Sequence, residues 1–237
     1  SLKKLIQKLE GGEDIDNFDL TQKVIIIYGT LLFLNALHQD NAYHGRIKIS
    51  NIILDSQLYP YVSDPFLYLL NENDPLNNSN NQLIDYIVSL PPEIIKDENY
   101  TIKSDIYSIG IMILQILTHQ INIYADLTND YAQILEIKRE NHLPNLDGIP
   151  NAQFRDIISR CLNSDPEKRP EAKEILDIIE KIGSDINLYD IHRITAFKSK
   201  FDSIHKNNEI DEVENPQLME MKKRADEGDI DMMYEYG

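Results

Sequence analysis

Two stretches of the chain are apolar on nearly every side, which is the pattern of helices buried in a protein core. They lie at about residues 20–38 and 103–118. The longest continuous apolar run, 24–37, is too short to cross a bilayer. We therefore expect both stretches to form the centre of a helical core.

Polar residues at the starts of these helices are candidate N-caps, because short polar side chains accept hydrogen bonds from the first backbone N–H groups. The candidates are Asp19 or Thr21 for the first helix and Ser104 or Asp105 for the second. Apolar residues that recur every three or four positions predict further helices. These lie at about 1–10, closed by Gly11 and Gly12, and at 130–140, 151–162, 170–182 and 187–206.

The predicted helix at 187–206 carries an apolar stripe on one face. Its members are Leu188, Ile191, Ile194, Phe197, Phe201 and Ile204. An exposed stripe of this size lowers solubility, so we expect the helix to dock rather than to act as a loose linker.

Short strands are expected at 52–55 and 59–64, joined by a turn at Ser56 and Gln57. The segment 71–82 is polar and rich in Asn, and we expect it to be a loop. One antiparallel hairpin among many helices gives a mainly helical α+β chain.

Charge and composition narrow the possible partners. The chain has 40 acidic against 23 basic residues and a net charge of −17, which disfavours nucleic acids and anionic membranes. Its one cysteine, Cys161, excludes an internal disulfide, lies in an amphipathic helix pattern and is expected in the core. The six histidines lack the spacing of a metal site. We expect a cytoplasmic protein with no nucleic-acid or membrane partner.

Short motifs follow one another in a characteristic order. They are HGRIKISN at 44–51, SDPF at 63–66, PPE at 91–93, SDIYSIG at 104–110 and DPEKRP at 165–170. Together they resemble the C-terminal lobe of eukaryotic protein kinases, and the HG and Y-S-x-G variants resemble the tyrosine-kinase-like group. The resemblance covers about residues 1–182. It implies buried E and F helices and a short β-hairpin, followed here by a C-terminal helical extension.

The resemblance also implies structural roles for particular residues. Glu93 and Arg169 would form a buried ion pair that ties the activation segment to the lobe. Asp105 would accept N–H groups of the catalytic loop from beneath, and His44 would be a buried structural histidine. Gly110 would allow close packing of its helix.

Three residues match positions that handle Mg-ATP in active kinases. Asn51 and Asp64 match the Mg²⁺ ligands, and Lys48 matches the lysine that contacts the transferred phosphate. They could retain nucleotide contact or serve only as hydrogen-bonding residues of the loop. The glycine-rich loop and strand lysine of the N-terminal lobe are not in the sequence. We therefore expect an excerpt of a longer chain, with no cofactor in this part and Mg-ATP possible in the full-length parent.

The catalytic positions depart from the family pattern. Arg46 stands where active kinases carry the catalytic aspartate, and a guanidinium cannot accept a proton. Gly45 replaces the arginine that reads a phosphorylated activation segment. Pro65 and Phe66 alter the metal-binding motif, and Tyr86 replaces the threonine that bonds the catalytic aspartate. The lobe is therefore expected to be a pseudokinase.

The C-terminal part is expected to differ from the lobe. Residues 183–215 are interpreted as the amphipathic helix followed by an acidic linker at 209–215, and 216–237 resemble the beginning of a SEL-like, tetratricopeptide-related repeat. The residues that match this repeat are Ala225, Gly228, Met232, Tyr236 and Gly237.

Three functions remain open at this point. The first is an inactive pseudokinase that acts as a scaffold or regulatory binding module for protein partners. The second is an active ATP-dependent Ser/Thr or Tyr kinase that uses a non-standard base, since phosphoryl transfer depends mostly on positioning and electrostatics. The third is a repeat-type interaction protein in which the kinase-like lobe is a structural cap.

Overall fold

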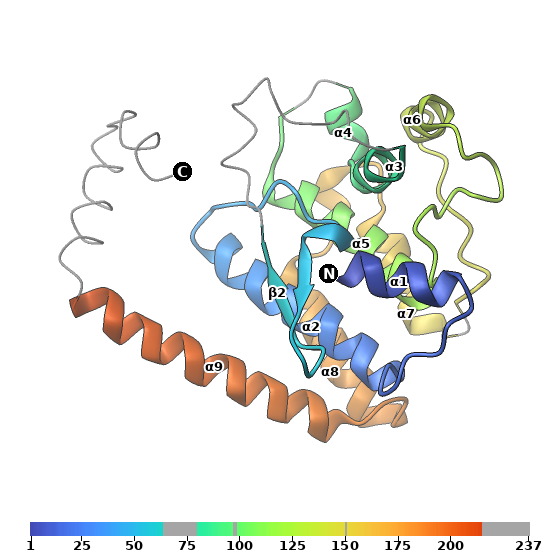
Figure 1. Ribbon diagram of the computed structural model, residues 1–237. Coiled ribbons are helices and arrows are strands. Elements are labelled where there is room, and N and C mark those ends of the chain that lie inside the picture. Colours follow the sequence, from blue (N-terminus) through green and yellow to red (C-terminus); the bar gives the residue numbers. More distant parts are fainter. Residues whose placement is uncertain (64–79, 97–98, 150, 215–237) are drawn as a thin grey trace. The chain divides into compact units, whose positions relative to one another are not determined.

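The computed structural model describes residues 1–63, 80–96, 99–149 and 151–214, with side chains omitted at 80–83 and 204–214. It falls into two compact units, Ser1–Ile194 and the segment from Thr195 onward. The helices are α1 (Leu2–Glu10), α2 (Leu20–Gln39), α3 (Asn80–Ser89), α4 (Pro92–Ile95), α5 (Ile102–Thr118), α6 (Tyr131–Arg139), α7 (Ala152–Cys161), α8 (Ala172–Ile186) and α9 (Ile191–Glu214). The strands are β1 (Ile52–Leu54) and β2 (Pro60–Val62), and short 3₁₀ turns lie at Ile49–Asn51 and Pro166–Lys168. Within the unit Ser1–Ile194, Figure 1 shows the other helices arranged around α2 and α5.

The centre of the first unit is formed by α2 and α5, as their all-round apolar sequences predict. Helix α2 packs against α5, α8 and β2, and α5 packs against α7. Gly110 permits this last contact, since a Cβ there would lie 2.7 Å from the Cβ of Cys161. Cys161 is fully buried, so its expected place in the core is confirmed.

Among the described helices, α2 is long and apolar enough to cross a membrane. However, 61% of its most apolar window is buried inside the fold. A core helix passes the same test of length and composition, and the packing of α2 against α5 and α8 matches that case.

The two strands pair antiparallel, with Ile52 opposite Val62 and Ile53 opposite Tyr61. Because side chains alternate along a strand, Ile52 points into the core and is fully buried, whereas Ile53 and Tyr61 are exposed. The hairpin confirms the predicted strands to within two residues at their ends. Together with the helices it confirms the mainly helical α+β class.

The helix starts confirm one predicted cap and correct the other. Asp19 caps α2 and accepts the N–H of Gln22 at 2.7 Å. The cap of α5 is Thr101, so the prediction of Ser104 or Asp105 was wrong. Ser104 instead completes a capping box with Thr101, and the carboxylate of Asp105 points toward the 44–51 loop.

Two further helical segments differ from the sequence predictions. Helix α3 begins at Asn80, inside the segment 71–82 predicted as a loop, and residues 71–79 lie outside the described part. Its Asn-rich start has low helix propensity, but Ile87 and Val88 are buried and stabilise the helix by packing. Helix α9 runs to Glu214, so residues 209–214 are helical rather than an irregular linker.

The start of α9 is fixed by contacts within the first unit. The backbone N–H of Asp190 donates to the hydroxyl of Thr21 at 3.1 Å. Arg193 donates to the carboxylate of Asp19 at 2.9 Å and to the side-chain oxygen of Gln22 at 3.0 Å. Of the apolar stripe, Phe197, Phe201 and Ile204 belong to the second unit, so the docking of this helix stays a prediction.

Candidate functional site

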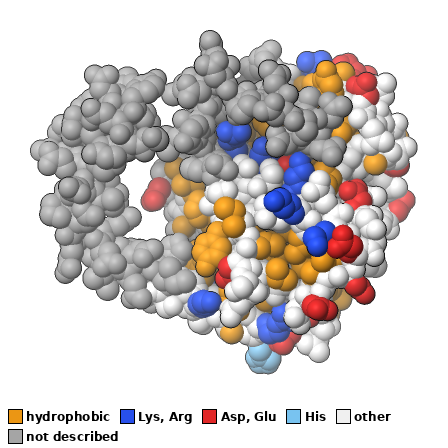
Figure 2. All heavy atoms as spheres, in the orientation of Figure 1, with side chains coloured by type: hydrophobic (Ala, Val, Ile, Leu, Met, Phe, Trp, Pro, Cys, Tyr) orange, Lys and Arg blue, Asp and Glu red, His pale blue; other side chains and the backbone are white. Residues whose placement is uncertain are grey.

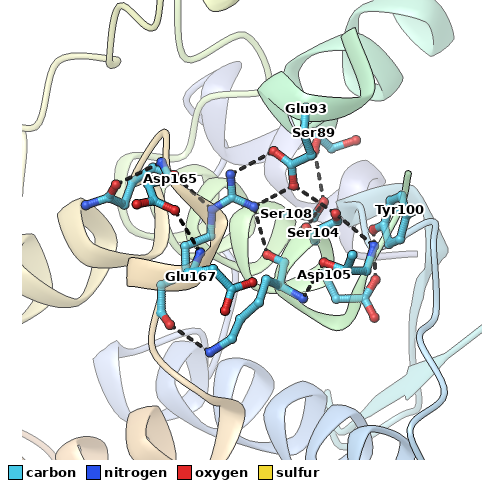
Figure 3. Close-up of polar contacts among 12 residues, drawn as sticks. Ser89, Glu93, Tyr100, Ser104, Asp105, Ser108, Asp165 and Glu167 are labelled. Carbon is cyan, nitrogen blue, oxygen red and sulfur yellow. Dashed lines mark hydrogen bonds and ion pairs between the residues drawn. The ribbon is translucent and has the colours of Figure 1, made fainter. Parts of the chain in front are cut away.

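The loop at 44–51 is held by one buried carboxylate from α5. The backbone N–H of His44 donates to Oδ2 of Asp105 at 2.7 Å, and that of Gly45 donates to Oδ1 at 2.9 Å. Asp105 is fully buried, and two further contacts join it, from Tyr100 Oη at 2.8 Å and His38 Nε2 at 3.1 Å. Asp105 thus accepts backbone N–H groups of the 44–51 loop, and its position beside Tyr100 is visible in Figure 3.

The start of this loop is also fixed by its own side chains. His44 is fully buried, packs edge-on against Phe33 and accepts the backbone N–H of Arg46 through Nδ1 at 3.2 Å. Gly45 adopts a φ of 77°, which a residue with a side chain rarely tolerates. His44 therefore lies inside the fold and contacts the backbone of its own loop.

Asn51 closes the other end of the loop. Its side-chain amide donates to the carbonyl of Arg46 at 2.9 Å, and it is only 6% exposed. Its backbone carbonyl accepts the backbone N–H and the hydroxyl of Ser63, at 2.9 and 3.0 Å. Asn51 therefore ties the loop to the residue that follows β2.

The predicted metal pair of Asn51 and Asp64 is only half described, because Asp64, Pro65 and Phe66 lie outside the described residues. Within the described residues, no group of three or more His, Cys, Asp or Glu side chains is placed to hold a metal. Asn51 Oδ1 is a suitable oxygen ligand for Mg²⁺, but the same loop carries Arg46 and Lys48 and no acid. The described residues by themselves therefore do not form a metal-binding cluster.

A buried acid beside the loop was not predicted. Asp85 of α3 is 1% exposed and lies 3.7 Å from the ammonium of Lys3 on α1. Burial raises the pKa of Asp85, against the opposing effects of Lys3, Ser50 and Lys48. Its sequence signal was weak, since one acid on a helix usually faces solvent.

Lys48 lies in the same cluster. Its ammonium is 5.7 Å from the ring centre of Tyr86, the residue next to Asp85. The structure thus brings together two residues singled out in the sequence, Lys48 and Tyr86. A cation over a ring face is attracted by the ring quadrupole but keeps its full charge.

The ion pair that joins α4 to the segment before α8 is present and buried. Arg169 NH1 lies 2.6 Å from Oε1 of Glu93, and its NH2 lies 2.8 Å from Oε2. Arg169 also donates to the carbonyls of Lys103 and Asn163, and Glu93 accepts the hydroxyl of Ser104 at 2.8 Å. Figure 3 shows the dashed contacts that lead from the carboxylate of Glu93, including the one to Ser104. Burial alone would raise the pKa of Glu93, but the bonds and charge of Arg169 outweigh it and lower the pKa.

A buried lysine extends this network, and no sequence pattern indicated it. Lys138 of α6 is 1% exposed and donates to the carbonyl of Val88 at 2.6 Å. Its ammonium lies 4.8 Å from the ring of Tyr107 and 5.8 Å from that of Tyr124. Burial lowers the pKa of Lys138 well below its ordinary range.

The described residues fix the backbone of the 44–51 loop and place a basic side chain at position 46. The backbone of the loop is held by Asp105 and Asn51. The side chain at position 46 is a permanent cation without an acceptor atom. The loop can therefore position groups and attract anions, but Arg46 cannot take a proton from a hydroxyl.

Comparisons with known proteins give a consistent result. Residues 2–178 match the family model described as the protein kinase domain. The chain is 26% identical, over 72% of its length, to the G-type lectin S-receptor-like serine/threonine-protein kinase SD1-1 of Arabidopsis thaliana. It is 31% identical, over 66% of its length, to the serine/threonine-protein kinase pakG of Dictyostelium discoideum. These matches span only 23% and 13% of the two relatives.

Proposed function

The chain belongs to the protein kinase family, and on this premise we propose that it is a catalytically inactive kinase-like module that binds protein partners as a scaffold or regulator. One observation carries the proposal: Arg46 occupies the position of the catalytic aspartate in a loop whose backbone frame is intact. We therefore attribute the proposed loss of activity to the side chain at position 46 and not to a disrupted loop backbone.

The expected loss of rate follows from the role of the missing aspartate. Removal of a general base alone typically lowers a rate by about 10²- to 10⁴-fold. Replacement of an anion by a cation also repels the metal ions that neutralise the phosphates in active kinases. We therefore expect turnover below detection rather than slow catalysis.

A second candidate, an active kinase with another base, is favoured by one observation. Asp85 is a carboxylate whose charge interacts with that of Lys48, and burial raises its pKa. A carboxyl that acts as a general base near neutral pH needs a raised pKa. However, it is 1% exposed and paired with Lys3, so a substrate hydroxyl has poor access to it. We therefore rank this candidate second.

The test is phosphotransfer by the full-length parent protein with radiolabelled ATP, Mg²⁺, generic substrates and the protein itself. We expect incorporation no higher than that of an Asp64→Ala variant, in which any family-type catalysis is removed. Incorporation that is lost in Asp64→Ala would contradict the proposal. If it were also lost in Asp85→Asn, the second candidate would be supported.

The C-terminal region adds to the proposed binding role. Residues 216–237 lie outside the described part, and we propose that they begin a SEL-like repeat, on the pattern of Ala225, Gly228 and Gly237. Such repeats stack on their neighbours and form binding surfaces for proteins. A repeat array beside an inactive lobe, in the cytoplasm, fits the assembly of protein partners better than catalysis.

A further inference from the structure

A groove of about 410 Å³ lies between the end of α1, α3 and the segment 119–130 that joins α5 to α6. Its volume falls within the range of about 300–1,000 Å³ that is usual for ligand pockets. It is separate from the 44–51 loop and has no part in the function proposed above. The side chains that line it are Gln7, Glu10, Ile84, Ile121, Asn122 and Asn129.

The lining of this groove combines apolar walls with oxygen acceptors. Ile84 and Ile121 supply the apolar part. Glu10 supplies a carboxylate, and Gln7 and Asn129 supply amide oxygens. Among the described residues that line the groove there is one acid and no Lys, Arg or His. The groove therefore favours a cationic ligand over an anion.

The carboxylate of Glu10 is held at the groove and keeps its charge there. Its Oε1 accepts the backbone N–H of Ile121 at 3.4 Å, which is long for a hydrogen bond. Lys8, the base nearest to Glu10 in the sequence, is paired with Glu13 at 3.1 Å. Within the described part of the chain, Glu10 thus retains most of its acceptor capacity for a ligand.

The wall opposite Glu10 is ordered by buried amide groups. The side-chain amide of Asn122, which is 7% exposed, donates to the carbonyl of Thr128 at 2.9 Å and to Oδ1 of Asn129 at 3.0 Å. The fully buried Gln115 of α5 donates to the carbonyl of Ile121 at 2.8 Å. Because this wall is already ordered, a ligand loses less affinity to the ordering of the protein.

An arginine side chain fits this lining better than a lysine side chain does. A guanidinium binds a carboxylate through two parallel N–H donors and has further donors for amide oxygens. It is also less strongly hydrated than an ammonium, so its transfer to a site beside Ile84 and Ile121 costs less.

The charge of the chain favours a basic protein partner. The net charge is −17. Figure 2 shows acidic side chains gathered toward the right-hand side of the view, the side on which α1 ends in Figure 1. A negative field over this surface speeds the approach of a basic partner and repels an acidic one.

We propose that this groove receives an arginine side chain of a protein partner. Glu10 is the charged contact, Gln7 and Asn129 are the amide contacts, and the two isoleucines cover the face of the guanidinium. This inference rests on the proposed binding function and names the chemistry of the partner.

The test uses full-length protein and fluorescein-labelled peptide pools whose central residue is Arg, Lys or citrulline, which has the shape of arginine without its charge. The flanking positions are random but exclude Lys, Arg and His. Fluorescence anisotropy should show that the Arg pool binds at least about threefold more tightly than the citrulline pool, with the Lys pool between them. Binding of the Arg pool should weaken as salt is raised. Hydrogen exchange followed by mass spectrometry should show that this pool protects amides within residues 121–129.

Matched variants assign the site. Glu10→Gln removes the charge and should weaken binding of the Arg pool about three- to tenfold, since Glu10 lies at the exposed rim. Gln7→Glu adds a second carboxylate and should strengthen binding, whereas Gln7→Lys should abolish it.

The control variant is Glu167→Gln, which makes the same change at an exposed position. Glu167 lies in the turn beside the first residues of α5, whereas the groove lies beyond the last, roughly 20 Å away along that helix. This variant should change binding less than about twofold, on the additivity expected of distant sites. Thermal melts of each variant separate loss of binding from loss of fold.

Four outcomes would overturn the inference. They are equal binding or equal absence of binding for the Arg and citrulline pools, unchanged binding in folded Glu10→Gln, protection that does not include residues 121–129, and binding of Nα-acetylarginine methylamide as tight as that of the Arg pool. The last would indicate a site for a small molecule. The phosphotransfer assay on the same preparation keeps the two proposals distinguishable. Absence of peptide binding without turnover contradicts only the arginine site, whereas Asp64-dependent turnover contradicts the proposed function.

Discussion

Removal of one partner of the Glu93–Arg169 ion pair should strongly destabilise the protein. The side chain of Arg169 is fully buried and that of Glu93 is 5% exposed, so water cannot replace a missing partner. Breaking a buried pair on one side typically costs about 3–5 kcal/mol. For a chain of this size the melting temperature should fall by about 6–20 °C, at about 2–4 °C per kcal/mol.

The structure also ranks the two single variants. Arg169 donates to the carbonyls of Lys103 and Asn163 in addition to Glu93, so Arg169→Ala leaves more acceptors unsatisfied. Glu93→Ala instead leaves a buried guanidinium that keeps those two carbonyl partners. We expect Arg169→Ala to be the more destabilising of the two at neutral pH.

The assay is urea and thermal denaturation of the single and double variants, followed by circular dichroism. The double variant should be less destabilised than the sum of the singles, with a coupling of about 0.5–3 kcal/mol. The control is the ion pair of Arg160 with Glu174, whose side chains are 36% and 47% exposed. Removal of this surface pair should cost about 1 kcal/mol or less. Additive losses for Glu93 and Arg169, or losses no larger than the control, would refute the reasoning.

Three further predictions test other parts of the fold. Because burial lowers the pKa of Lys138 below 10.5, the unfolded chain binds more protons between the lowered value and 10.5. Wild-type stability should therefore rise with pH across that window, and urea melts of Lys138→Met at several pH values should lose this rise. Asp105→Asn places an amide group against N–H donors and should loosen the loop, seen as faster hydrogen exchange of the amides of residues 44 and 45. Gly110→Ala should cost about 1–3 kcal/mol in denaturant melts through overpacking against Cys161, whereas Gly148→Ala, whose new Cβ would have only an ordinary 3.6 Å contact, should cost little.

The sequence was most informative where a motif fixes both a residue type and its partner. Asp105, Glu93 and Arg169 could be assigned because their motifs occur in order and each role needs a specific charge. The buried helices followed from apolar composition alone, since a helix that is apolar on every side needs an apolar environment such as a protein core.

The sequence failed where a residue acts through a distant partner. Lys138 pairs with the carbonyl of Val88, 50 positions away, and no local pattern marks such a contact. Asp85 was not singled out, because its partner Lys3 lies on another helix. Ser104 and Asp105 both looked like N-caps of α5, and only their side-chain directions show that Thr101 is the cap.

The way in which Asp105 holds the 44–51 loop bears on how such a lobe can evolve. Its carboxylate accepts the backbone N–H groups of residues 44 and 45, and the side-chain amide of Asn51 donates to the carbonyl of residue 46. None of these bonds uses the side chain at position 46. Substitutions at position 46 can therefore change the chemistry of the loop while these backbone bonds persist.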